Sequence, residues 1–175
     1  MQAVRTWAGL ARLTVLMWRA GAARDDRRFE DECALTTQAL EVARGIYSTM
    51  AETAWMLNRH ACALRRVGRV EEAVAALDEA LELCRRVDAA DSINYAQLLN
   101  NAAIMHWIAR DVPAALRFLD ESIAMRVRLA QSPGDAAFAK AVTLREEMRT
   151  TDVGDIANAT RIRAFTRERD DEKEA

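Results

Sequence analysis

The sequence contains two histidines, His60 and His106, which are its candidates for acid–base or metal chemistry. A di-iron site in a helical bundle needs a glutamate three residues before each histidine, but Leu57 and Ala103 occupy those positions. The sequence also lacks H-E-x-x-H, a phosphate-binding glycine loop and G-x-S-x-G. His60 and Cys62 are two residues apart, so they point to different faces of a helix. We therefore predict no catalytic residue, metal site or cofactor, and expect both imidazoles to lie in packing contacts. An enzyme or metal protein that uses His60, His106 and Cys62 is the least favoured alternative.

The cysteines and a pair of glutamates offer little further chemistry. Cys33, Cys62 and Cys84 are odd in number and lack C-x-x-C spacing. This pattern predicts small buried thiols in a reducing compartment, rather than disulfides or zinc ligands. Glu71 and Glu72 open a predicted helix, where the helix dipole favours carboxylates. General acid–base catalysis by this pair is a remote alternative.

The charge balance argues against a nucleic-acid partner. The chain carries 25 basic and 27 acidic residues, with an isoelectric point near 5.8, whereas a phosphate-binding domain usually has a basic excess. Lys140 and Lys173 are the only lysines, so the basic residues are mostly arginines. This bias reflects either GC-rich codon usage or a preference for guanidinium–carboxylate contacts. No apolar run approaches the roughly 20 residues of a membrane span, so we predict no membrane partner. The arginine-rich composition favours a cytoplasmic bacterial protein.

The first 24 residues contain four arginines and no acidic residue. This charge signature is shared with transit peptides, which makes targeting one alternative. A secretory signal is disfavoured because the arginines interrupt the apolar stretch. Apolar residues recur here at the helical spacing that a packed helix requires, namely Val4, Trp7, Ala11, Val15 and Trp18. We therefore favour a structural helix.

The composition predicts a helical protein. Alanine accounts for 35 of 175 residues, and residues that prefer strands are scarce, which nearly excludes a sheet. Apolar residues recur with a period of about 3.6 between short breaks and predict helices over residues 2–20, 27–45, 50–66, 70–87, 93–109, 112–130, 135–150 and 155–169. Turn and capping residues support these breaks, namely Thr49 with Glu52, Gly68, Asp91 with Ser92, Asp111 before Pro113, and Asp135.

The middle of the chain is repetitive. When residues 57–83 are aligned with residues 99–125, a shift of 42, 8 of 27 positions are identical. Weaker matches on either side predict about four helical hairpins, of which the second and third are clear. One hairpin cannot bury its apolar face alone, so neighbours must stack. Small residues let paired helices approach closely and leucines fill the space between hairpins, as expected for Ala61, Ala73, Leu57, Leu64, Leu77 and Leu81.

Residues 57–81 resemble the tetratricopeptide repeat. The resemblance lies in a small residue in the first helix, a glycine in the turn and three small or apolar residues in the second helix, which here are Ala61, Gly68, Ala73, Leu77 and Ala80. The 42-residue period and Leu99-Asn-Asn-Ala-Ala are similar to the longer repeats of kinesin light chains and many bacterial proteins. The other copies depart from the motif at Glu32, Arg110, Arg145 and Arg161.

The resemblance implies an all-α, right-handed α-solenoid of about four antiparallel hairpins. We expect one domain over residues 1–170, with clear repeats at about 54–87 and 96–129. Degenerate hairpins are expected at about 2–45 and 135–169, followed by a charged, disordered tail over residues 171–175.

The resemblance also implies that the first helices of successive hairpins line a concave groove. It places the groove residues at Trp55, Arg59, Cys62 and Arg66 in one hairpin, at Gln97, Asn101, Ile104 and Ile108 in the next, and Asn58 and Asn100 at the edge. Carboxamides pair with a peptide backbone, arginines clamp a carboxylate, and Trp55 can stack on a side chain. The structural alternatives are solvated arginines, asparagines that cap or bridge helices, and a tryptophan that fills a gap.

These features predict a non-catalytic adaptor that binds a protein or peptide, either acidic or through a C-terminal carboxylate. The alternative is a homodimer formed by the terminal hairpins, because apolar residues gather in the first and last predicted helices. These residues are Trp7, Trp18, Ile156, Ile162 and Phe165.

Overall fold

The computed structural model describes residues 2–47, 51–87, 92–129 and 135–150. In this part of the chain the backbone forms seven helices and no strand. The helices are α1 (Gln2–Asp25), α2 (Phe29–Ile46), α3 (Ala51–Arg66), α4 (Val70–Arg86), α5 (Ile93–Ile108), α6 (Val112–Arg128) and α7 (Ala136–Thr150). None of them is both long enough and apolar enough to span a bilayer.

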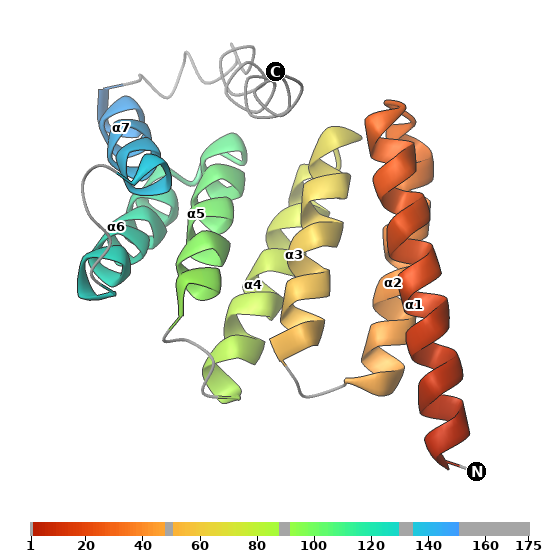
Figure 1. The fold of residues 1–175 in the computed structure, drawn as a ribbon. Helices are drawn as coiled ribbons and strands as arrows, with labels where there is room; N and C mark the ends of the chain where they lie inside the picture. Colours follow the sequence, from red (N-terminus) through yellow and green to blue (C-terminus); the bar gives the residue numbers. More distant parts are fainter. Residues whose placement is uncertain (1, 48–50, 88–91, 130–134, 151–175) are drawn as a thin grey trace.

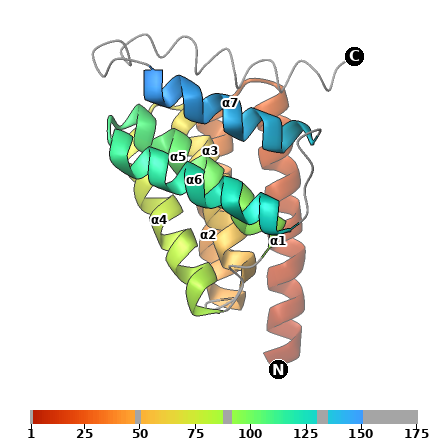
Figure 2. The ribbon, with the colours of Figure 1, turned by 90° about the vertical axis from the view of Figure 1, so that its left-hand side faces the viewer.

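The helices stack as hairpins in chain order. Helices α1 and α2, α3 and α4, and α5 and α6 pack against each other as pairs, and α7 packs against α6. Neighbouring pairs meet where α2 contacts α3 and α4 contacts α5, and α3 also touches α5 directly. Figure 1 shows the pairs in sequence from α1 and α2 at the right to α7 at the left. Figure 2, turned by 90°, places α6 and α7 in front and shows α1 reaching beyond the other helices. The predicted all-α solenoid of helical hairpins is confirmed.

Alanines form the contacts within each hairpin. Ala61 and Ala73 are completely buried in the second hairpin, and Ala103 and Ala115 are completely buried at the same positions of the third. Leucines surround these contacts and are equally inaccessible to solvent, namely Leu57, Leu64, Leu77 and Leu81. Burial stabilises the stack by roughly 1.5–3 kcal/mol for each of these leucines.

Each hairpin turns through one residue in the left-handed backbone region. These residues are Arg27 (φ 60°), Gly68 (φ 78°) and Arg110 (φ 66°). The amide after each of them donates to a carbonyl five residues earlier, as Arg69 does to Leu64 at 2.9 Å, which is the Schellman arrangement of a helix end. Arg110, which departs from the glycine of the motif, therefore adopts the conformation that glycine adopts in the second hairpin.

The helix boundaries agree with the predicted ones to within two residues, except at the end of α1. Ser92 accepts a hydrogen bond from the amide of Tyr95, Asp111 from that of Ala114, and Asp135 from that of Phe138, so these three predicted caps are confirmed. Helix α1 continues to Asp25 rather than ending at residue 20. Thr49, Asp91, the predicted helix 155–169 and the tail lie outside the described residues.

The predicted packing face of α1 is wrong, although the helix itself is present. Trp7 and Trp18 are 72% and 74% exposed, and Ala11 and Val15 on the same side are exposed as well. The helix instead packs through Leu16, Ala20 and Ala23, with Leu13 and Met17 partly buried. The apolar spacing identified a helix correctly, but α1 has a second apolar side, and the smaller residues pack more closely against α2.

Helix α7 also departs from the repeat pattern. Arg145 occupies the small-residue position, but its guanidinium lies 3.4 Å from Asp120 of α6 and remains partly exposed. The neighbouring Leu144 is buried instead, together with Ala141 and Met148. Helix α7 therefore uses a face rotated by one residue relative to α3 and α5.

Replacing Arg110 by glycine is expected to stabilise the protein. Glycine adopts a positive φ without the steric cost that a side chain adds, and a net gain of about 0.5–1 kcal/mol is expected. Gly68→Ala should lower the free energy of unfolding by about 1 kcal/mol, because the backbone is strained even though the added Cβ meets no atom within 4 Å. Urea denaturation measures both changes, and equal stabilities for the two variants would contradict the assigned turn.

Candidate functional site

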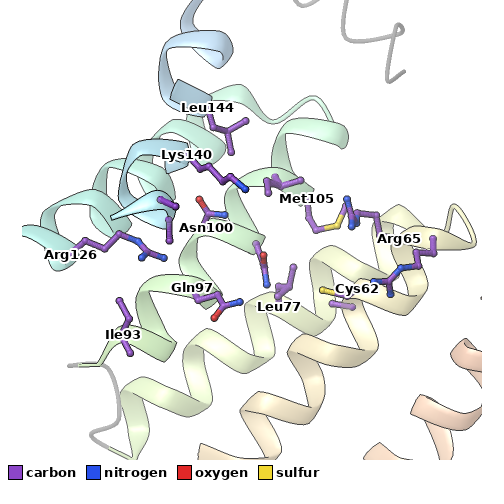
Figure 3. A pocket seen from close by; sticks show the side chains of 16 residues that line it. Cys62, Arg65, Leu77, Ile93, Gln97, Asn100, Met105, Arg126, Lys140 and Leu144 are labelled. Atoms are coloured by element: carbon purple, nitrogen blue, oxygen red, sulfur yellow. The ribbon is translucent and has the colours of Figure 1, made fainter. Parts of the chain in front are cut away.

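A cavity of about 430 Å³ opens between the first helices of the second, third and fourth hairpins. Figure 3 shows Arg126 on one side of it and Arg65 on the other, with Gln97 and Asn100 between them. Its lining residues come from α3 (Ala61, Cys62, Arg65 and Arg66), α4 (Leu77), α5 (Ile93, Gln97, Asn100, Asn101, Ile104 and Met105), α6 (Arg126) and α7 (Ala136, Ala137, Lys140 and Leu144). This volume lies within the range of about 300–1,000 Å³ of ligand pockets.

The cavity gathers most of the predicted groove residues. Those that line it are Cys62, Arg66, Gln97, Asn100, Asn101 and Ile104. Helix periodicity places the residues of α5 along one side at intervals of three and four. Trp55, Asn58, Arg59 and Ile108 are not among the lining residues. The cavity therefore collects the predicted groove residues of α5 except Ile108. Of the predicted residues of α3, it collects Cys62 and Arg66 alone.

Asn58 supports the cavity from behind. Its side chain is buried, and its Oδ1 accepts a hydrogen bond of 2.8 Å from Nδ2 of Asn101. The bond joins α3 to α5 and fixes the orientation of the Asn101 carboxamide at the cavity wall. This is the bridging arrangement that the sequence left open for the asparagines. Asn58 itself has no surface on the cavity.

The charged side chains that line the cavity, among the described residues, are all basic. Arg65 and Arg66 come from α3, Arg126 from α6 and Lys140 from α7. Arg126 is almost completely buried, and this burial lowers the pKa of its guanidinium below its ordinary value, against the opposing effect of nearby Asp135. A positive cavity in a protein of net charge −2 is a local feature, because the overall composition gives no basic excess.

The sequence did not indicate Arg126 and Lys140. Arg126 lies on the second helix of its hairpin, which the repeat assigns to the convex side. Lys140 lies on α7, where the repeat is degenerate. The sequence does set Lys140 apart, because it is one of only two lysines in an arginine-rich chain. This rarity does not indicate where in the fold Lys140 lies.

Arg66 is shared between the cavity and a buried carboxylate. Its Nη1 lies 2.9 Å from Oε1 of Glu32 in α2, and the side chains are 20% and 7% exposed. Burial raises the pKa of Glu32, while Arg66, Arg24 and Arg59 act in the opposite direction. Arg66 is therefore neither a purely solvated side chain nor a residue that only lines the cavity, since it also forms a polar contact between the first two hairpins.

Trp55 and Arg59 lie on the exposed side of α3, outside the cavity. Trp55 is 36% exposed. Arg59 is exposed too, but surrounding protein atoms desolvate its guanidinium and lower its pKa, and Arg24 lowers it further. These two residues stay predicted contacts for a ligand that extends from the cavity toward α1.

The residues of the metal alternative lie at different junctions. His60 packs toward α2, where its Nδ1 is 3.1 Å from the Thr36 hydroxyl. His106 is buried between Asp78, at 3.2 Å, and Asp111, at 3.4 Å, with its ring against Phe118. Cys62 lines the cavity. Within the described residues no three His, Cys, Asp or Glu side chains come together as metal ligands.

Comparison with known proteins identifies the repeats. Residues 52–126 match the sequence profile described as the tetratricopeptide repeat. These residues belong to the tetratricopeptide repeat family. The match covers α3 to α6, which are the two hairpins whose alanines and leucines repeat most regularly. The predicted family is therefore confirmed. No curated protein matches the chain in sequence.

Two solved structures support the tetratricopeptide repeat fold. BtubC (BKLC) from P. vanneervenii aligns with a TM-score of 0.64 and 21% identity over 89% of this chain. The alignment spans 64% of the length of BtubC. The N-terminal domain of stress-induced protein-1 (STI-1) from C. elegans aligns with a TM-score of 0.57 and 17% identity, over 83% of this chain and 98% of that domain. At these identities the similarity establishes the fold alone.

His60 is expected to titrate below its ordinary pKa of 6.5, because burial of the ring and the nearby Arg69 lower its pKa. The unfolded chain then binds a proton at a higher pH than the folded protein does. The His60 contribution to stability is therefore present above pH 6.5 and is lost as the pH falls through 6.5 toward the folded pKa. His60→Gln should remove this loss, which urea unfolding between about pH 8 and 5 measures. Parallel pH profiles of the two proteins would contradict the assignment.

Proposed function

We propose that this protein is a non-catalytic adaptor that binds an acidic protein segment in the cavity between α3, α5 and α7. The observation that carries the proposal is the coincidence of a concave cavity with a uniformly basic lining in a tetratricopeptide repeat domain. Arginine forms bidentate contacts with carboxylates, and Arg65, Arg66 and Arg126 supply guanidinium groups from two helices.

Carboxamides add the contacts that an extended peptide requires. Gln97, Asn100 and Asn101 line the cavity, and each carboxamide carries both a donor and an acceptor group. Because Asn58 holds Asn101 in place, part of the site is arranged before a ligand binds, which lowers the entropy lost on association. A segment that ends in a C-terminal carboxylate fits the basic lining as well as one with acidic side chains. Trp55 and Arg59 are the proposed contacts for residues outside the cavity.

The buried thiols Cys33 and Cys84 are unpaired. They support a reducing compartment. Together with the arginine-rich composition, they favour a cytoplasmic bacterial protein as part of this proposal.

Loss of one cavity cation should weaken binding of an acidic peptide by about tenfold, the value of a charged hydrogen bond of roughly 1.4 kcal/mol. The probe is a fluorescein-labelled octapeptide that ends in three glutamates and a free C-terminal carboxylate. Fluorescence anisotropy compares the wild type with Lys140→Gln, and Arg86→Gln is the matched control. Arg86 is an exposed arginine whose ion pair with Glu82 lies at the surface.

The control peptide has glutamines in place of the glutamates and a C-terminal amide. Weak, salt-independent binding of this peptide and tight, salt-sensitive binding of the acidic peptide would support the proposal. Equal affinities for the two peptides, or equal losses in Lys140→Gln and Arg86→Gln, would refute it.

Self-association through α1 is a second candidate function. Helix α2 covers one side of α3, and α4 covers the same side of α5. No described helix covers the corresponding side of α1. Trp7 and Trp18 are exposed on α1 with Val15 between them, a patch that a second copy would bury. Ile156, Ile162 and Phe165, the other residues of this prediction, lie outside the described residues.

If α1 pairs with a second copy, light scattering at high protein concentration should give the mass of a dimer, twice the chain mass of 19.6 kDa. Trp7→Ser combined with Trp18→Ser should restore the monomer, since it removes the aromatic surface without touching the buried side of α1. Trp55→Ser is the matched control on α3. A monomeric wild type at every concentration would exclude this second function and leave peptide binding unaffected.

A further inference from the structure

The junction between the first and second hairpins contains an ion pair at positions that are otherwise apolar. Glu32 occupies the place of Ala73 in the second hairpin and Ala115 in the third, both of which are completely buried. Arg66 occupies the place of Ile108, one hairpin earlier. A buried ion pair contributes little net stability compared with apolar residues of similar size, so packing alone gives no reason for this exchange.

The geometry connects this pair to the cavity. One oxygen of Glu32 accepts from Arg66, while the other oxygen, Oε2, is buried without a hydrogen-bond partner in the described residues. On its other side, Arg66 lines the cavity where an acidic ligand is proposed to bind. A single guanidinium therefore lies between a fixed internal carboxylate and the position of an external one.

Among the described residues, the charges that shift the pKa of Glu32 are all positive. Arg24 acts from α1, and Arg59 and Arg66 act from α3. Burial opposes them by disfavouring the ionised carboxylate, so its protonation state depends on a balance that Arg66 dominates among the charges. Any event that reduces the effect of Arg66 on Glu32 shifts that balance toward the protonated acid.

We propose that binding of an anionic ligand beside Arg66 is coupled to uptake of one proton by Glu32. This inference rests on the proposed function, because it concerns how the same cavity is regulated. The proton comes from the solvent and the carboxylate of Glu32 becomes a neutral carboxylic acid. Whether Arg66 turns toward the ligand or contacts both groups, a second negative charge at Arg66 disfavours ionised Glu32.

The direction of the pH dependence follows from linkage. The complex binds more protons than the free protein does, so the affinity for the anion increases as the pH falls. Within the pH window between the two titrations of Glu32, free and occupied, the dissociation constant changes by up to about tenfold per pH unit for one proton. Above that window ionised Glu32 competes with the ligand for Arg66.

Isothermal titration calorimetry of the full chain tests this coupling. The acidic octapeptide is titrated between about pH 5.5 and 8, where its own carboxyl groups stay ionised, in buffers of different ionisation enthalpy. The wild type should take up more protons than Glu32→Gln does, with one proton as the upper limit. Because glutamine resembles the protonated acid, Glu32→Gln should bind the peptide more tightly than the wild type does at the highest pH of this range. The two affinities should converge as the pH falls.

Glu30→Gln is the matched control, because Glu30 is an exposed carboxylate in the first turn of the same helix. It should behave like the wild type, and proton uptake by groups other than Glu32 and Glu30 is common to all three proteins. Glu32→Ala is the second variant if Glu32→Gln is unstable. It places at this position the alanine that the second and third hairpins have there, namely Ala73 and Ala115.

Equal proton uptake in the wild type and in both Glu32 variants would overturn the inference. Weaker binding by Glu32→Gln at every pH would also overturn it, since Glu32 would then only hold Arg66 in position. Failure of the wild type to bind the acidic peptide would instead refute the proposed function. The two failures are therefore distinguishable.

Discussion

The close contact between paired helices at alanine is the constraint on which the remaining structure depends. Ala61 and Ala73, and again Ala103 and Ala115, leave no side chain beyond Cβ between the helices and are completely buried. Each hairpin therefore forms a thin unit with apolar residues on both sides, and it becomes stable only when neighbours cover them. Stacking places α3 beside α5, and the cavity opens between these helices and α7.

Polar side chains are found at the junctions between hairpins, where packing is less uniform. Asn58 and Asn101 join α3 to α5, Glu32 and Arg66 join α2 to α3, and His106 reaches Asp78 across α4 and α5. A buried polar group is costly unless it is paired, so these contacts fix how successive hairpins meet. Two of the three contacts also contribute a residue, Asn101 or Arg66, to the cavity wall. The contacts between hairpins and the cavity wall therefore share these two side chains.

The sequence predicted the helices and the repeat because both depend on local spacing and small residues. It also predicted the α5 side of the cavity, since Gln97, Asn101 and Ile104 share one helix face. It did not predict Arg126 and Lys140, whose placement depends on how α6 and α7 pack. The wrong packing face of α1 has a related cause, because periodicity cannot tell which of two apolar sides a neighbouring helix covers. Residues 151–175 lie outside this comparison.

The central claim is that the basic cavity between α3, α5 and α7 is the ligand site. The most direct measurement is a two-dimensional NMR titration of the isotope-labelled protein with the acidic octapeptide. The side-chain amides of Gln97 and Asn100 report on the cavity, and the indole signals of Trp7 and Trp18 report on the far surface of α1. The account predicts saturable shifts of the carboxamides with unchanged indoles. Shifts confined to the indoles or to the outer surface of α2 and α4 would contradict it.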